Sequence, residues 1–257
     1  MQYKGDIGLY LSGGQVPIKG CGVFITPPTI KAVSQFGEDD FLLAVKIVSC
    51  DRGFVVPIKE ATPALENVPD FNILLTVLQS DDQMKDVVDR FLALVFPDYN
   101  VEVTKNMICF RVGDDKAMKG MVNQFNCEEF CTTVKELFSP QSRGESQEFN
   151  PANAKAEEIA RKLEAARRRK SQETSGGEKA SLFGLYVSVI SIGMSVDINT
   201  IYRYTPFQLY DSFNRYMKKG EYDLYMKIKT TPMMDTSKME EVEHWATNMY
   251  ETISDDS

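Results

Sequence analysis

The sequence is poor in the residues from which most catalytic and metal sites are built. Its 257 residues include one histidine, His244, so a multi-histidine metal site is excluded and a Ser-His-Asp triad would depend on that residue alone. We expect His244 to lie on a helix surface beside a buried or half-buried Trp245. No cysteine pair has zinc-site spacing, and no acidic loop resembles an EF-hand. The sequence therefore predicts no catalytic site, no cofactor and no metal, and we interpret the protein as a non-enzyme.

Long apolar runs and targeting signals are also missing. The longest apolar run, 182–196, is shorter than the ~20 residues that cross a bilayer, so it predicts a buried helix rather than a membrane span. Residues 1–6 lack the basic and apolar regions of a signal peptide. The five cysteines form an odd set without a CxxC pair, which favours reduced, structural thiols in a cytoplasm. We expect no contact with a membrane.

Excess positive charge is absent as well. The formal net charge of −8 argues against a nucleic-acid-binding protein, which would normally carry a basic face. One basic cluster stands out in the segment 151–179 and consists of Arg167, Arg168, Arg169 and Lys170. We interpret this segment as a solvated, charged helical arm. Contact with an acidic helix or with nucleic acid is the alternative, although no aromatic residues interleave the charges.

Residues 11–15, Leu-Ser-Gly-Gly-Gln, match the signature loop of ABC-type ATPases. Those proteins also need a phosphate-binding loop, GxxxxGK[ST], before the signature, and this chain has no such loop. We therefore interpret residues 11–15 as a turn that follows a strand at 7–11.

The composition changes twice along the chain and predicts three parts. An α+β N-terminal domain is expected at 1–140, a flexible linker with the charged helix at 141–180, and a small all-α C-terminal domain at 181–257. Within the first part, 51–70 is expected to be mostly loop because of its four glycine and proline residues. The other expected elements there are a strand at 7–11, helices at 29–36, 38–48, 80–95 and 127–138 (the last capped by Asn126), and a hairpin at 101–112.

The strongest helix signal in the sequence begins at Thr205. Thr205 is a suitable N-cap, Pro206 fits the first helical position, and Gln208 supplies the reciprocal half of a capping box. Gly220 is expected to end this helix in the left-handed conformation.

The body of this helix carries a broad apolar face with several aromatic residues. Leu209, Tyr210, Phe213 and Tyr216 recur at helical spacing, and Trp245 follows near the end of the chain. A small helical unit needs such residues for its core, yet tyrosine and tryptophan also dominate binding hot spots. Both interpretations stay open for any one of the five, and we name the set as the candidate protein-binding residues.

The order of these features resembles the tail assembly chaperones, or virion-associated proteins, of tailed phages of Gram-positive bacteria. The run from Thr205 to Tyr216 carries most of the resemblance, whereas residues 230–234 depart from the small-residue segment expected in the family. The remaining matching segments are 27–31, 36–39, 126–130, 149–151, 159–163, 181–182, 222–223 and 243–245.

This resemblance implies a non-enzymatic function. The protein would bind the long helical tape-measure protein, or another tail protein, during tail assembly in the cytoplasm of the infected host. Self-association is a further implied contact. Two alternatives remain: a structural tail or baseplate component that stays in the virion, and a small intracellular regulatory adaptor.

Overall fold

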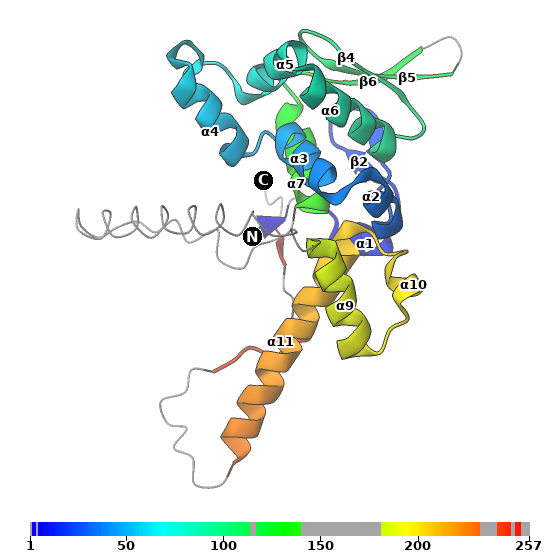
Figure 1. Cartoon of the computed structure of the whole chain (residues 1–257), viewed down its shortest axis with the longest axis vertical. Coiled ribbons are helices and arrows are strands. Elements are labelled where there is room, and N and C mark those ends of the chain that lie inside the picture. The colour runs from blue at the N-terminus through cyan, green and yellow to red at the C-terminus, as the bar shows by residue number, and fades with distance from the viewer. Residues whose placement is uncertain are drawn as a thin grey trace, which may run out of the picture.

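The computed structural model describes residues 2–3, 5–113, 117–139, 181–231, 241–247 and 250–252 (Figure 1). Helices and short strands alternate up to residue 139, and the part from residue 181 is mainly helical. The predicted fold class, an α+β N-terminal part followed by a helical C-terminal part, is confirmed. None of the helices in the described ranges is long and apolar enough to cross a membrane.

The sheets are small, with two or three strands each. β2 (Val16–Ile18) pairs antiparallel with β3 (Val23–Ile25), and β1 (Gln2–Tyr3) pairs in parallel with β7 (Glu251–Thr252) near the chain ends. The third sheet has the order β4-β5-β6 and is antiparallel throughout. It contains the predicted hairpin, with strands β4 (Asn100–Val103), β5 (Ile108–Val112) and β6 (Ala117–Val122).

Four helices of the N-terminal part lie where the sequence predicted them, and predicted side-chain caps hold two of them. Thr29 caps α2 (Ile30–Phe36), and Asp81 caps α6 (Asp82–Val95) by accepting hydrogen bonds from two backbone amides of its first turn. Three acidic residues open α3 (Glu38–Val48), where they complement the helix dipole. α7 spans Cys127–Phe138 as expected, but Asn126 does not cap it, because its side chain bonds instead to the backbone of Gly20, Met121 and Asn123.

Two segments of the N-terminal part were predicted wrongly. Residues 7–11 belong to a helix, α1 (Ile7–Ser12), because the Asp6 side chain caps it and Gly13 ends it at a φ of 70°. The segment 51–70 is not mostly loop, because it forms α4 (Arg52–Ala61) and a short 3₁₀ turn, η1 (Pro63–Leu65). The Asp51 side chain caps α4, and this cap offsets part of the free energy that the helix loses because Pro57 cannot donate a backbone hydrogen bond. Another helix, α5 (Asp70–Ser80), follows without an expected counterpart.

The core extends across both sides of the segment 140–180. Phe41 of α3 is fully buried and lies edge-on to Phe91 of α6, Phe138 of α7 and Phe183 of α9 (Leu182–Met194). Residues from both predicted domains thus belong to one apolar cluster. The boundaries at 140 and 181 stay a prediction, and the charged arm with Arg167, Arg168, Arg169 and Lys170 lies outside the described residues.

The C-terminal part contains α9, the short α10 (Ile198–Ile201) and the long α11 (Pro206–Thr230). α11 continues through Gly220, so the predicted end of the helix there is wrong. A glycine inside a helix costs only about 1 kcal/mol, and the ion pair between Lys219 and Asp223 stabilises the helix on both sides of it. The second half of α11 projects away from the body of the protein (Figure 1). His244 and Trp245 were expected on a helix, but they lie in a turn. The turn is closed by the Ala246 amide, which donates to His244 Nδ1, and by the Thr247 hydroxyl, which donates to the His244 carbonyl.

Candidate protein-binding site

The start of α11 is fixed by the predicted capping box. The Gln208 backbone amide donates to Thr205 Oγ1 at 3.3 Å, and the Thr205 amide donates to Gln208 Oε1 at 2.8 Å. Gln208 Nε2 also donates to the carbonyl of Leu11 at 2.7 Å. The segment that matches the ATPase signature is therefore the C-terminal end of α1 and its turn, held against the start of α11.

Two of the candidate binding residues lie in the core of the protein. Leu209 is fully buried, and Tyr210 is 6% exposed. The Tyr210 ring stacks on Phe183 with a centroid distance of 5.7 Å, and its hydroxyl reaches the Phe138 carbonyl at 3.5 Å. Burial raises the pKa of Tyr210 well above its ordinary value. Neither residue is accessible to a partner in this structure.

Two further candidates pack against α9. Phe213 stacks on Tyr186 with a centroid distance of 4.1 Å. Tyr216 lies against Gly193, where an added Cβ would come within 2.3 Å of its ring. Tyr210, Phe213 and Tyr216 therefore follow one another along α11, and their rings pack against α9. The structure brings these residues together, as the periodicity predicted, and uses them to build the helical pair.

Trp245 lies apart from this row, on the segment 241–247 beside the second half of α11. It is half-buried and stacks on His244, whose ring meets Tyr222 of α11 at 4.7 Å. Glu243 forms an ion pair with Lys218 of α11 at 3.8 Å. Tyr250 then donates a hydrogen bond to Asp211, a buried carboxylate that also accepts from Arg215 at 3.1 Å. The described residues between 241 and 250 thus run back along α11.

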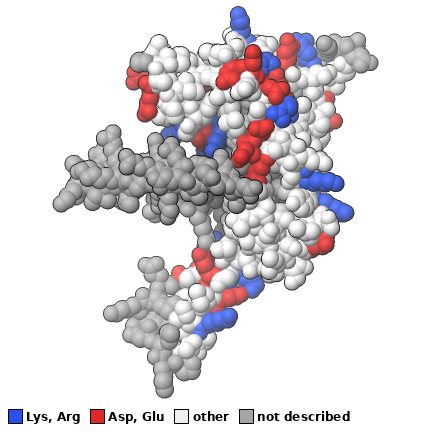
Figure 2. All heavy atoms as spheres, viewed as in Figure 1, with Lys and Arg blue, Asp and Glu red and all other residues white. Residues whose placement is uncertain are grey.

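The accessible apolar side chains of the C-terminal part are ones that the sequence had not singled out. On α9, Leu185 is 54% exposed and Ile192 is 84% exposed. The view in Figure 2 shows few charged side chains over this region. The signal in the sequence is that α9 has no charged residue on any side. A helix at the surface of a small helical part can bury only one side, so some apolar residues of such a helix must stay exposed. Other exposed apolar residues of the C-terminal part are Met194, Ile198, Met217, Leu224 and Met226.

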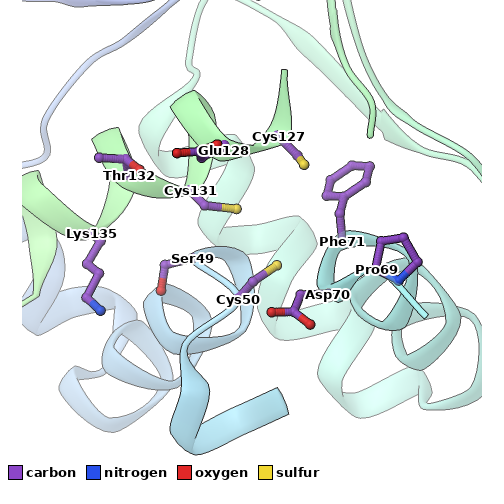
Figure 3. Close-up of a pocket in the computed structure, with 10 residues that line it drawn as sticks. All are labelled: Ser49, Cys50, Pro69, Asp70, Phe71, Cys127, Glu128, Cys131, Thr132 and Lys135. Carbon is purple, nitrogen blue, oxygen red and sulfur yellow. The ribbon is translucent and has the colours of Figure 1, made fainter. Parts of the chain in front are cut away.

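A second feature is a surface pocket of about 310 Å³ between α3, α5 and α7 (Figure 3). The thiols of Cys50, Cys127 and Cys131 point into it. A hydrogen bond with Cys50, together with burial, raises the pKa of Cys131, and burial raises that of Cys127. The other lining residues are Ser49, Pro69, Asp70, Phe71, Glu128, Thr132 and Lys135.

Two of the three thiols that line this pocket, those of Cys127 and Cys131, are in their less reactive form at neutral pH. A thiolate is the reactive form of cysteine, and a raised pKa keeps these two thiols protonated at neutral pH. Cys131 also donates to the carbonyl of Val48 at 3.3 Å, as a small structural residue would. In the described ranges, no group of histidine, cysteine, aspartate or glutamate is arranged to hold a metal ion.

Alkaline pH is expected to destabilise the fold through Cys21. Burial and the nearby Glu129 raise the pKa of this thiol from 9.0 to about 11. Its contribution to stability is complete below pH ~9 and is lost as the pH rises towards 11, because the unfolded chain loses this proton first. The free energy of unfolding, obtained from thermal unfolding at pH 8 and at pH 10.5, should be lower by up to about 2 kcal/mol at the higher pH. The loss should be smaller in Cys21→Ala, and equal losses in both proteins would contradict the assignment.

The helical C-terminal part is also similar to a known protein family. Residues 177–250 match the model of a family described as the YomV second domain. This family is phage-derived, from the SPbeta region of Bacillus phage. The match suggests a phage protein. No curated protein and no solved structure matches the chain.

The part similar to the YomV second domain includes α9, α10, α11 and the returning segment 241–247. All five candidate binding residues lie within it. The phage origin that the resemblance implied is thus supported by the C-terminal part of the chain.

Proposed function

We propose that the protein is a tail assembly chaperone that binds the tape-measure protein in the cytoplasm of the infected host and has no enzymatic activity. The observation that carries this proposal is the exposed apolar surface of α9 within the part that matches a phage-derived family. Exposed apolar surface on a folded protein commonly marks a site for another protein.

The physical task of such a chaperone is to cover an aggregation-prone helix until the tail assembles on it. Helix-in-groove recognition uses apolar contacts at helical spacing and needs no catalytic group. A helical pair held together by the rings of Tyr210, Phe213 and Tyr216 is a rigid support for such contacts. The reduced thiols expected for Cys50, Cys127 and Cys131 suit a cytoplasmic protein.

Co-expression with the tape-measure protein encoded by the same phage tests this proposal. We expect the tape-measure protein to remain soluble and to co-purify with the chain, and to precipitate when expressed alone. Mass spectrometry of purified virions should then detect the tail-tube protein, as the positive control, but not this chain.

The second candidate is a structural tail or baseplate component, which the phage-derived match fits equally well. Its presence in virions at a fixed ratio to the tail-tube protein would favour that candidate. If the tape-measure protein neither co-purifies with the chain nor gains solubility from it, the chaperone proposal is wrong.

A further inference from the structure

The outer face of α9 is unusual because it is both exposed and free of charge. α9 contains 13 residues, Leu182–Met194, and none of them is charged. Phe183, Val187 and Ile190 lie on its inner face and belong to the core. Leu185 and Ile192, seven residues apart, lie on the opposite side and remain 54% and 84% exposed. We call this side, with the exposed Ser188 and the half-buried Val189 between them, the outer face of α9.

The outer face has the size of a contact with one helix. Thirteen helical residues extend over roughly 20 Å, or between three and four turns. A stable dimer of folded subunits buries about 800 Å² on each partner, which is more than one side of such a short helix offers. A second copy of this chain would therefore need contacts elsewhere, whereas a single helix needs only a strip of this length.

The absence of charge restricts the chemistry of the occupant. A charged side chain docked on the outer face would lose its water without meeting an opposite charge. The occupant must therefore present an uncharged apolar seam with a spacing that matches Leu185 and Ile192. An amphipathic helix fits this requirement, since its charged side stays in water while its apolar seam is covered.

We infer that the outer face of α9 is the docking site for one amphipathic helix of the partner protein, with an uncharged seam against Leu185 and Ile192. The inference rests on the proposed function, which identifies this helix as part of the tape-measure protein. It differs from the interpretation of the sequence, which placed binding on the face of α11 that includes Tyr210 and Phe213.

The test is capture of the tape-measure protein by the full-length chain and by single lysine variants. Ile192→Lys and Leu185→Lys each place a charge in the docking site, and we expect each to weaken capture tenfold or more. Phe125→Lys is the matched control, because Phe125 is 86% exposed but lies in the turn before α7. It should bind like wild type. All three side chains are exposed, so the melting temperatures should agree within a few degrees.

Other outcomes would overturn the inference in different ways. If wild type binds and both α9 variants bind equally well, the docking site lies elsewhere and the chaperone proposal stands. A loss confined to Leu224→Lys, which alters an exposed residue of α11, would move the site to that helix. If wild type does not bind at all, the chaperone proposal fails as well. Size-exclusion chromatography with light scattering gives one further check: a wild-type dimer that becomes monomeric in Ile192→Lys, with capture unchanged, would make this face a self-association surface.

Discussion

Replacing Phe41 by alanine is expected to lower the free energy of unfolding by about 3–5 kcal/mol. Phe41 is fully buried, and its ring lies edge-on to four other rings. The centroid distances are 5.5 Å to Phe91, 5.7 Å to Phe138, and 6.3 Å to both Phe36 and Phe183. Truncation removes these contacts and leaves a cavity that the surrounding rings cannot fill without distortion. Urea unfolding, followed by circular dichroism, measures the loss.

Phe125→Ala is the matched control for Phe41→Ala. The same side chain is removed, but from a site that is 86% exposed, so the change should stay within about 0.5 kcal/mol. A loss of several kcal/mol in this control, or none in Phe41→Ala, would contradict the described core.

Phe41→Ala also tests whether the two sides of the segment 140–180 unfold together. Trp245 is the only tryptophan of the chain, and it lies beside α11, far along the sequence from Phe41. Phe41 contacts Phe183 of α9, so Phe41→Ala should shift the tryptophan fluorescence transition together with the circular dichroism transition. A fluorescence transition that stays at its wild-type midpoint would support independent domains with the boundaries predicted from the sequence.

Local signals in the sequence predicted those elements that local contacts decide. The caps at Thr29, Asp81 and Thr205 bond to amides within three residues, so the information needed to place them lies in a few neighbouring side chains. The hairpin around residues 104–107 is similar, since Thr104 bonds to the backbone of Met107 across the turn. These helices begin, and the hairpin turns, where they were expected.

Errors arose where contacts distant in sequence, or a compensating cap, outweighed a local signal. Pro57 and its neighbours indicated a loop, yet the Asp51 cap allows α4 to form around that proline. Asn126 had the pattern of a helix cap, but its amide bonds to the carbonyl of Gly20, more than a hundred residues away. The Asp51 cap lies close to Pro57 in the sequence and could have been weighed against it, whereas the contact of Asn126 with Gly20 is not encoded in a short window of sequence.

Prediction of the binding site from sequence was limited in the same way, because accessibility depends on contacts distant in sequence. Helical periodicity placed Tyr210, Phe213 and Tyr216 on one face correctly, but it could not tell whether another part of the chain covers that face. α9 covers it, and in doing so leaves Leu185 and Ile192 exposed on its own far side. Which of two apolar faces remains accessible is decided by tertiary packing alone.

Tyr210→Ala is expected to destabilise the protein by about 3–5 kcal/mol rather than to remove a binding contact from an intact surface. The ring is 6% exposed, stacks on Phe183 and meets Tyr186 edge-on at 5.9 Å. Tyr210→Phe keeps these ring contacts and loses only the hydroxyl, whose distance of 3.5 Å to the Phe138 carbonyl marks a weak hydrogen bond. It should cost less than about 1 kcal/mol.

Thr205→Ala calibrates this comparison, because the loss of the cap of α11 should cost about 1 kcal/mol without touching an aromatic contact. Urea unfolding of the three variants gives the stabilities, and capture of the tape-measure protein gives the binding. Tyr210→Phe and Thr205→Ala should capture the partner like wild type. If Tyr210→Ala kept wild-type stability and lost capture, Tyr210 would be an interface residue and the packing of α11 on α9 would have to open for the partner.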